Sequence, residues 1–262
     1  MWGWLKRWAE KPAAVAEKGK PGHVVSRADI LAWREAARRP LWLPLTQAGQ
    51  SDTNPNRFGG TPSLAAGETW PCCQTCGAVM PLFLQLDTGS LPTGAPLAKE
   101  GSAGLLQLFG CRQKSCLAFT QDGSALARVL PVAPRYPTYS TVRTAVLAPN
   151  TITGWQAETQ EPTSDEWDEA NGQLPPDFTD DDDAVDYPWF RNGRSRDKLG
   201  GWPDWVQFPE YSTCRVCERP HTLVFQLESE ENLDFVFGDV GTAYLTYCAQ
   251  HPDELTFSWQ CS

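Results

Sequence analysis

One motif occurs twice in this chain, and the repeat limits the possible folds more than any other feature of the sequence. Gly59-Gly60-Thr61-Pro62 is followed by Cys73-Gln74-Thr75-Cys76 and then by an apolar stretch around Gln85. The same order returns 141 positions later, without insertion or deletion, as Gly200-Gly201-Trp202-Pro203, Cys214-Arg215-Val216-Cys217 and Gln226. A register kept over this length indicates a duplication. We therefore predict two β-rich halves related by a pseudo-two-fold axis.

Short apolar segments predict a mostly β fold of the α+β class. The strand candidates are Leu41–Leu45, Met80–Leu86, Leu105–Phe109, Leu126–Val132, Thr141–Leu147, Leu223–Leu227, Phe235–Phe237, Thr242–Tyr247 and Leu255–Trp259. Several of them alternate apolar and polar residues, which is typical of half-buried antiparallel strands. Helices are expected only near the N-terminus.

Two N-terminal segments have helical patterns. Trp2–Ala16 is a short amphipathic stretch, which we expect to dock on the body of the protein. Ser26 is the N-cap of a clearer helix that Pro40 ends. We expect its apolar face to consist of Ile30, Leu31, Trp33 and Ala36.

These observations divide the chain of 262 residues into four parts. We expect N-terminal helices and a lead-in over 1–56, the first half over 57–150, an acidic linker over 151–197 and the second half over 198–262. A chain of this length can bury a substantial core.

Each half contains two pairs of residues that could bind a metal ion. In the first half, Cys73 and Cys76 are followed by Cys111 and Cys116; in the second, Cys214 and Cys217 are followed by Cys248 and His251. Two such pairs brought together supply the four thiolate or imidazole donors that a structural zinc ion prefers. We predict up to two structural zinc sites.

Other roles for these cysteines remain open. Some could be buried small apolar residues, while Cys72 and Cys261 are left over and either could replace a neighbour. A redox role for Cys-x-x-Cys is less favoured, because neither copy opens a helix after a βα turn.

The sequence favours a protein that is not an enzyme. It lacks a Gly-x-Ser-x-Gly elbow, a phosphate-binding loop and a His-Glu-x-x-His motif. His221 stands where the first copy has Met80, which weakens it as a catalytic candidate. Zinc with four protein ligands leaves no position for water.

The negative charge is concentrated in one segment. Twelve of the 32 acidic residues lie between Ala157 and Asp186, where there is no Lys or Arg, and subtracting them from the net charge of −10 leaves +2. Asp180, Asp181, Asp182 and Asp183 are consecutive and lack the alternation of a calcium loop. We expect these four residues to attract a basic protein partner, with a solubilising loop as the alternative. The segment would repel nucleic acid.

The sequence predicts a cytoplasmic protein without a membrane partner. No apolar run approaches the roughly 20 residues of a membrane helix, and the N-terminus has no signal-peptide core. In a reducing compartment, paired Cys-x-x-Cys motifs are metal ligands more often than disulfides.

Several motifs of the second half resemble the YwqG-like family of bacterial proteins, a domain family without an assigned function. They are Lys198–Gln207, the Cys-x-x-Cys, Phe225-Gln226, Phe237–Gly241, Tyr247-Cys248 and Phe257–Gln260. The first half, through Arg57–Gly60, Trp70-Pro71, Leu84–Leu86 and Leu106–Cys111, also resembles the N-terminal part of the programmed-cell-death-two proteins. Together the resemblances cover roughly Arg57 to Gln260.

The resemblance implies a protein-binding β fold rather than an enzyme. Some YwqG-like proteins are immunity proteins that neutralise a secreted bacterial toxin, and we expect this role here. The programmed-cell-death-two proteins imply an alternative, a zinc-stabilised chaperone of a basic ribosomal protein. A third possibility is an enzyme or small-ligand binder that uses a cleft between the halves.

Overall fold

The computed structural model describes residues 27–98, 104–113, 116, 123–131, 136–137, 146–163, 166 and 196–262. In these residues the protein is mostly β, with one helix, α2 (Arg27–Ala36). The strands are β1 (Arg39–Ala48), β2 (Arg57–Phe58), β3 (Ser63–Leu64), β4 (Leu82–Asp87), β5 (Gly104–Gly110), β6 (Ala125–Pro131), β7 (Tyr136–Pro137), β8 (Asn150–Gln160), β9 (Lys198–Gly200), β10 (Thr222–Glu228), β11 (Thr242–Tyr247) and β12 (Leu255–Gln260).

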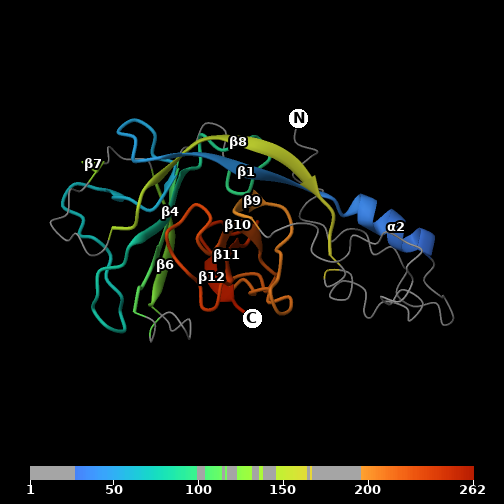
Figure 1. Ribbon diagram of the computed structural model, residues 1–262. Coiled ribbons are helices and arrows are strands. Elements are labelled where there is room, and N and C mark those ends of the chain that lie inside the picture. Colours follow the sequence, from blue (N-terminus) through green and yellow to red (C-terminus); the bar gives the residue numbers. More distant parts are fainter. Residues whose placement is uncertain are drawn as a thin grey trace.

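Two long antiparallel strands form the centre of the sheet. β1 pairs with β8 over its full length, from Arg39 opposite Gln160 to Ala48 opposite Asn150, with an irregularity after Leu45. The two strands run side by side across the top of Figure 1. β9 pairs with β1 only at Leu41 and Trp42. Pro44 is therefore tolerated in β1, because its missing N–H falls where the strand has no second neighbour.

The remaining strands of the sheet extend outward from this pair in the same manner on both sides. The order is β12-β11-β10-β9-β1-β8-β2-β4-β5-β6, and neighbouring strands are antiparallel. β9, β10, β11 and β12 are the counterparts of β2, β4, β5 and β6 in this order. The two short strands β3 and β7 pair separately.

The sheet curls until it is nearly closed. Its edge strands β6 and β12 approach each other, with some Cα atoms within 8 Å, although no strand pairing joins them. One apolar cluster fills the concave side and includes Phe58 and Phe83 from the first half and Phe225 and Phe237 from the second. Because both halves contribute to this cluster, the space between them is packed core.

A flap covers the opposite face of each half. The first flap comprises residues 60–80 and the second flap residues 201–221. Each begins at a glycine with positive φ, 71° at Gly60 and 77° at Gly201. A Cβ there would lie 2.6 Å from Gln50 Oε1 and 2.5 Å from Gln160 Oε1, respectively. Glycine is therefore required at both positions for two reasons: it adopts a positive φ without strain, and it has no Cβ that would clash with the glutamine.

The helix forms where the sequence predicts it, but with a different buried face. In α2, Ile30 and Trp33 are buried, whereas Leu31 is 44% exposed and Ala36 is exposed. The expected face was thus wrong in part, because the buried stripe follows Ile30, Trp33 and Ala37 at helical spacing. Ser26 and the Trp2–Ala16 segment lie outside the described residues.

Two other segments differ from the sequence-based expectation. Phe235–Phe237 is not a strand but part of the loop between β10 and β11. Residues 151–160, expected to begin the acidic linker, are part of β8. Three acids of the expected linker have defined partners: Glu158 pairs with Arg196, Glu161 with Arg34 and Arg38, and Glu166 accepts hydrogen bonds from Trp205 and Tyr211. Most of the predicted strand Thr141–Leu147 is outside the described residues.

Candidate metal centres

The first Cys-x-x-Cys lies at the tip of a tight turn in the first flap. The Cys73 N–H donates to the carbonyl of Ala78 (2.8 Å), and the Gly77 N–H donates to the carbonyl of Cys73 (2.8 Å). Gly77 has a φ of 72°, which closes the turn. A bridge between Cys72 and Val79 forms the base of the turn. The turn therefore holds the two cysteine backbones in a fixed relation.

The second Cys-x-x-Cys has the same turn at the equivalent place. The Cys214 N–H donates to the carbonyl of Arg219 (2.9 Å), and the Glu218 N–H donates to the carbonyl of Cys214 (2.9 Å). Glu218 adopts a φ of 57° although it is not glycine. The base is a bridge between Thr213 and Pro220. The repeated cysteines thus reflect a repeated local structure.

In each set, the second pair of residues lies in the connection after the second strand that follows the Cys-x-x-Cys. Cys111 follows β5, and its N–H donates to the carbonyl of Ser124 just before β6 (2.8 Å). Cys248 follows β11, and the turn continues through the His251 N–H, which donates to the carbonyl of Cys248 (3.1 Å). Each set therefore connects a flap to an end of the main sheet.

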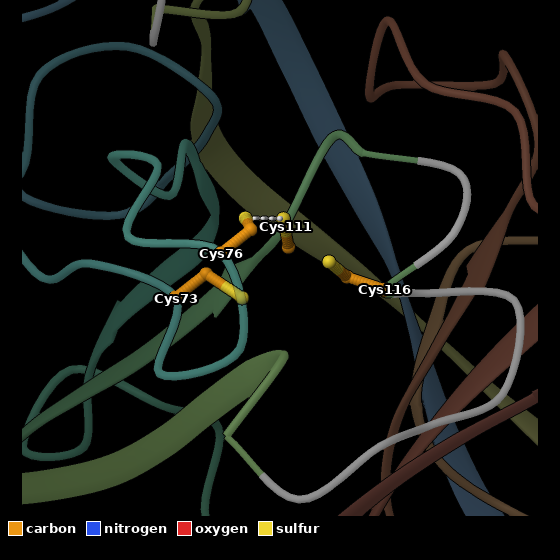
Figure 2. A group of neighbouring side chains, drawn as sticks. All are labelled: Cys73, Cys76, Cys111 and Cys116. Atoms are coloured by element: carbon orange, nitrogen blue, oxygen red, sulfur yellow. Dashed lines mark hydrogen bonds between the residues drawn. The ribbon is translucent and has the colours of Figure 1, made fainter.

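All eight predicted ligands converge in two clusters. Within each set the sulfur or imidazole nitrogen atoms lie within 4.8 Å of one another; the sets are Cys73, Cys76, Cys111 and Cys116, and Cys214, Cys217, Cys248 and His251. Figure 2 shows the four sulfur atoms of the first set around a common centre, with a dashed line between Cys76 and Cys111. None of the cysteines is in a disulfide.

The distances match tetrahedral coordination. Sulfur atoms about 2.3 Å from a zinc ion lie about 3.8 Å from each other. The Cys76–Cys111 and Cys217–Cys248 sulfur atoms are each 3.6 Å apart, and His251 Nδ1 lies 3.5 Å from Cys214 Sγ and 3.6 Å from Cys248 Sγ. Both sets could therefore hold a metal ion, and their soft donors suit zinc.

Local electrostatics favour a thiolate at the first cysteine of each set. Burial opposes ionisation of Cys73, but N–H groups of Cys76 and Thr75 and the thiols of Cys76 and Cys111 outweigh it and lower its pKa to about 7. The balance of burial against neighbouring N–H and thiol groups lowers the pKa of Cys214 to about 7 as well. Burial raises the pKa of Cys111 to about 12. In each set the thiolate form of one cysteine is thus favoured relative to an ordinary thiol.

A buried glutamine fixes the start of each flap. The sequence repeat locates these two glutamines but does not predict their hydrogen bonds. Gln85 Oε1 accepts from the Ser63 N–H (2.9 Å), and Gln85 Nε2 donates to the Pro55 carbonyl (2.8 Å). Gln226 repeats both bonds 141 positions later, with the N–H of Asp204 (2.8 Å) and the carbonyl of Arg196 (3.2 Å).

A second pair of glutamines was missed. Gln50 Oε1 accepts from the Thr61 N–H (2.8 Å), and Gln160 Oε1 accepts from the Trp202 N–H (2.9 Å). These two glutamines are 110 positions apart rather than 141, so the spacing of the repeat carries no signal for them.

The second flap makes polar contacts with β12 and with Glu166. Gln260 Oε1 accepts from the N–H groups of Val206 and Gln207, both at 3.1 Å, and Gln260 Nε2 donates to the Phe208 carbonyl (2.9 Å). The buried Glu166 accepts from the Trp205 indole and, at 2.6 Å, from the Tyr211 hydroxyl. The second flap is therefore fastened to the sheet by polar contacts in addition to its candidate metal ligands.

The other candidate residues do not join a cluster. Cys72 is exposed and Cys261 half-buried. His221 is buried, with Nδ1 3.4 Å from Thr246 Oγ1, and burial lowers its pKa. The candidate partner-binding residues Asp180, Asp181, Asp182 and Asp183 are outside the described residues.

The sequence of the chain matches the model of a protein family. Residues 56–261 match the family model described as a domain of unknown function, DUF1963. The chain belongs to this family. The DUF1963 domain thus begins just before β2 and includes both flaps and both ligand sets. A comparison with curated proteins finds no match. In the described part of the chain, no helix is long and apolar enough to cross a membrane.

Proposed function

We propose that this DUF1963 protein is a non-catalytic protein-binding module whose two flaps are held in place by structural zinc. The carrying observation is that each ligand set is complete, with four protein donors drawn from a flap and a strand end. Zinc in such a set has no open position for water or substrate. The expected role of the metal is therefore to stabilise the fold.

We also propose that the two halves arose by duplication and are related by a pseudo-two-fold axis. The strand order from the central pair outward, the two Cys-x-x-Cys turns and the paired glutamine contacts support this relation. The axis would pass between β1 and β8. A duplicated fold with diverged surfaces suits a binding module, because one half can change while the other preserves the scaffold.

The second flap supplies the best candidate contact surface among the described residues. Phe208 and Val216 on this flap are 60% and 63% exposed. Large apolar side chains at such exposure are typical of binding surfaces when they are grouped with polar neighbours. The acidic residues Asp180–Asp183 would add long-range attraction for a basic partner.

The proposed partner is a basic protein, and the resemblance to YwqG-like proteins favours a secreted bacterial toxin. In this role the protein would work as a cytoplasmic immunity protein that blocks the toxin by binding it. A ribosomal protein is the other basic partner consistent with the acidic segment. The two differ in when they bind, since a chaperone would capture its client during synthesis.

Affinity purification of the tagged chain from its native host, followed by mass spectrometry and binding with purified components, tests this proposal. A basic toxin that binds at one to one and loses its toxicity is the expected result. A stoichiometric ribosomal protein would replace the immunity role by the chaperone role. Recovery of no basic partner, with both zinc ions present, would contradict the binding proposal.

Matched variants locate the surface. Phe208→Ser and Val216→Ser should weaken binding at least about tenfold, while Leu45→Ser, at an exposed residue of β1, should leave it unchanged. Neutralising Asp180–Asp183 to Asn should slow association mainly at low salt. Equal effects of the flap and β1 variants would contradict the assignment to the second flap.

A further inference from the structure

The two metal centres differ in ligand chemistry and in exposure. The first set has four sulfur donors and includes Cys76, which is exposed; the second set has three sulfur donors and His251, and each of its residues is buried or half-buried. A zinc ion with four thiolates keeps two excess negative charges, whereas zinc with three thiolates and a neutral imidazole keeps one. The first centre therefore carries the larger negative charge, and one of its cysteines is more exposed to solvent than any ligand of the second centre.

These differences affect reaction with oxidants. Oxidation of cysteine follows its thiolate character and its exposure. Metal-bound sulfur is thiolate, so both centres contain the reactive form, but only the first presents it at an exposed residue. A small hydroperoxide should therefore react first at Cys76.

A partner thiol for the oxidised Cys76 lies close by on a different element. Cys76 is in the first flap and Cys111 follows β5, and their sulfur atoms are 3.6 Å apart. A disulfide requires about 2.05 Å, so a modest rotation of the two side chains would join them. The bond would connect the flap to the sheet, as the metal ion does.

Resting on the proposed zinc function, we propose that Cys76 and Cys111 form an oxidation site for a hydroperoxide, which converts the first centre from a zinc link to a disulfide link. The Cys76 thiolate attacks one oxygen of the peroxide, so that an S–O bond forms as the O–O bond breaks. When the peroxide is hydrogen peroxide, the leaving group is hydroxide. The resulting sulfenic acid is attacked by the Cys111 thiolate; the S–S bond forms, the S–O bond breaks, and a second hydroxide leaves. The two sulfurs lose two electrons and the peroxide gains them.

Loss of two donors releases the first zinc ion, because only Cys73 and Cys116 remain. The flap nevertheless stays attached, since the new disulfide joins the same two elements. The second centre, whose ligands are all buried or half-buried, keeps its zinc. Oxidation thus exchanges one kind of cross-link for another in the first half only.

Hydrogen peroxide added to the full chain loaded with two zinc ions tests this inference, with a chromogenic chelator as readout. One equivalent of zinc should leave at least about tenfold faster than the second, and peptide mapping should find a Cys76–Cys111 disulfide that a thiol reductant reverses. Release of both ions at one rate, or a Cys73–Cys76 disulfide instead, would overturn the proposal.

Two variants serve as controls for the rates of zinc release. His251→Cys gives the second set four sulfur donors without altering the first, and should bring its release closer to that of the first centre. Cys72→Ser removes an exposed thiol outside both sets and should change neither rate; a slower first release in this variant would overturn the assignment to Cys76. If the purified chain binds no zinc before peroxide is added, the proposed function itself fails, which is a separate result.

Discussion

The two flaps occupy equivalent positions but are fastened differently. In the first, the apolar cluster beneath the flap includes Cys73, Cys111 and Cys116 together with Trp70 and Phe109. In the second, the corresponding cluster of Trp205, Leu223 and Tyr244, with Tyr211 against it, contains no metal ligand. The turn that presents the cysteines is the same in both flaps, while the packing around it differs. The comparison indicates that metal loss should affect the first half more.

Substitution of a ligand gives the largest expected effect. A structural zinc ion contributes roughly 10 kcal/mol to the folding of small zinc domains, so losing one should cost at least about 3 kcal/mol here. Cys73→Ser should destabilise the protein more than Cys214→Ser, because Cys73 is part of the apolar cluster beneath its flap, whereas Cys214 is not part of the cluster beneath the second flap. Denaturant unfolding, with metal content measured in parallel, checks this.

Equal losses of stability from the two serine variants would contradict the difference between the flaps. Chelation of both zinc ions supplies the upper limit for comparison. If chelation leaves the unfolding midpoint unchanged, neither set binds a stabilising metal ion.

The next effect depends on pH and on one pair of equivalent residues. Asn56 and Asp197 occupy matching positions, and each accepts a hydrogen bond from a backbone N–H, that of Asp87 (2.6 Å) or that of Glu228 (2.7 Å). Burial, together with the nearby Glu231, raises the pKa of Asp197 to about 8. The folded state therefore binds its proton more tightly than the unfolded state, in which the pKa of Asp is about 3.9.

The stabilising contribution of protonated Asp197 is complete below about pH 4 and is lost progressively as the pH rises to about 8, at about 1.4 kcal/mol per pH unit. Asp197→Asn should remove this slope and be more stable than the parent at pH 8.5. Asn56→Asp should introduce a similar loss into the first half. Unfolding free energies between pH 6.5 and 8.5 in excess zinc measure both; parallel slopes for parent and Asp197→Asn would contradict the assignment.

The smallest predicted effect should be nearly equal in the two halves. Gln85→Ala and Gln226→Ala each leave a backbone N–H and a carbonyl without their partner, at a cost of about 1–3 kcal/mol. Because both glutamines make the same two backbone contacts, their losses of unfolding free energy should agree within about 1 kcal/mol. A much larger loss for one glutamine would show that the networks are not equivalent.

The sequence predicted the features that depend on local spacing. Leu82–Asp87 and Thr242–Tyr247 follow apolar runs of strand length, and the two clusters that could hold a metal ion follow from the repeated Cys-x-x-Cys and its second pair. β8 was missed because the polar sequence Asn150–Gln160 stands next to an acidic segment, and its partner β1 lies far away in the chain. Tertiary pairing decided its conformation.

The contacts around the flaps could not be predicted for a related reason. Gln260 reaches Val206 across 54 positions, and Gln160 reaches Trp202 across 42. Such bonds depend on how strands are ordered in the sheet, and no local pattern encodes that order. The buried face of α2 was also misassigned at Leu31, since its pattern fits more than one stripe.

The central β1–β8 pair has a consequence for synthesis of the chain. Its paired residues are 102 to 121 positions apart, so at roughly 5–20 residues per second β1 waits on the order of ten seconds for its partner. β9, which covers its other side, emerges later still. A strand edge open for that long can pair with a neighbouring nascent chain. Pro40 and Pro44 donate no N–H from β1, and we expect them to protect this edge until its own partners arrive.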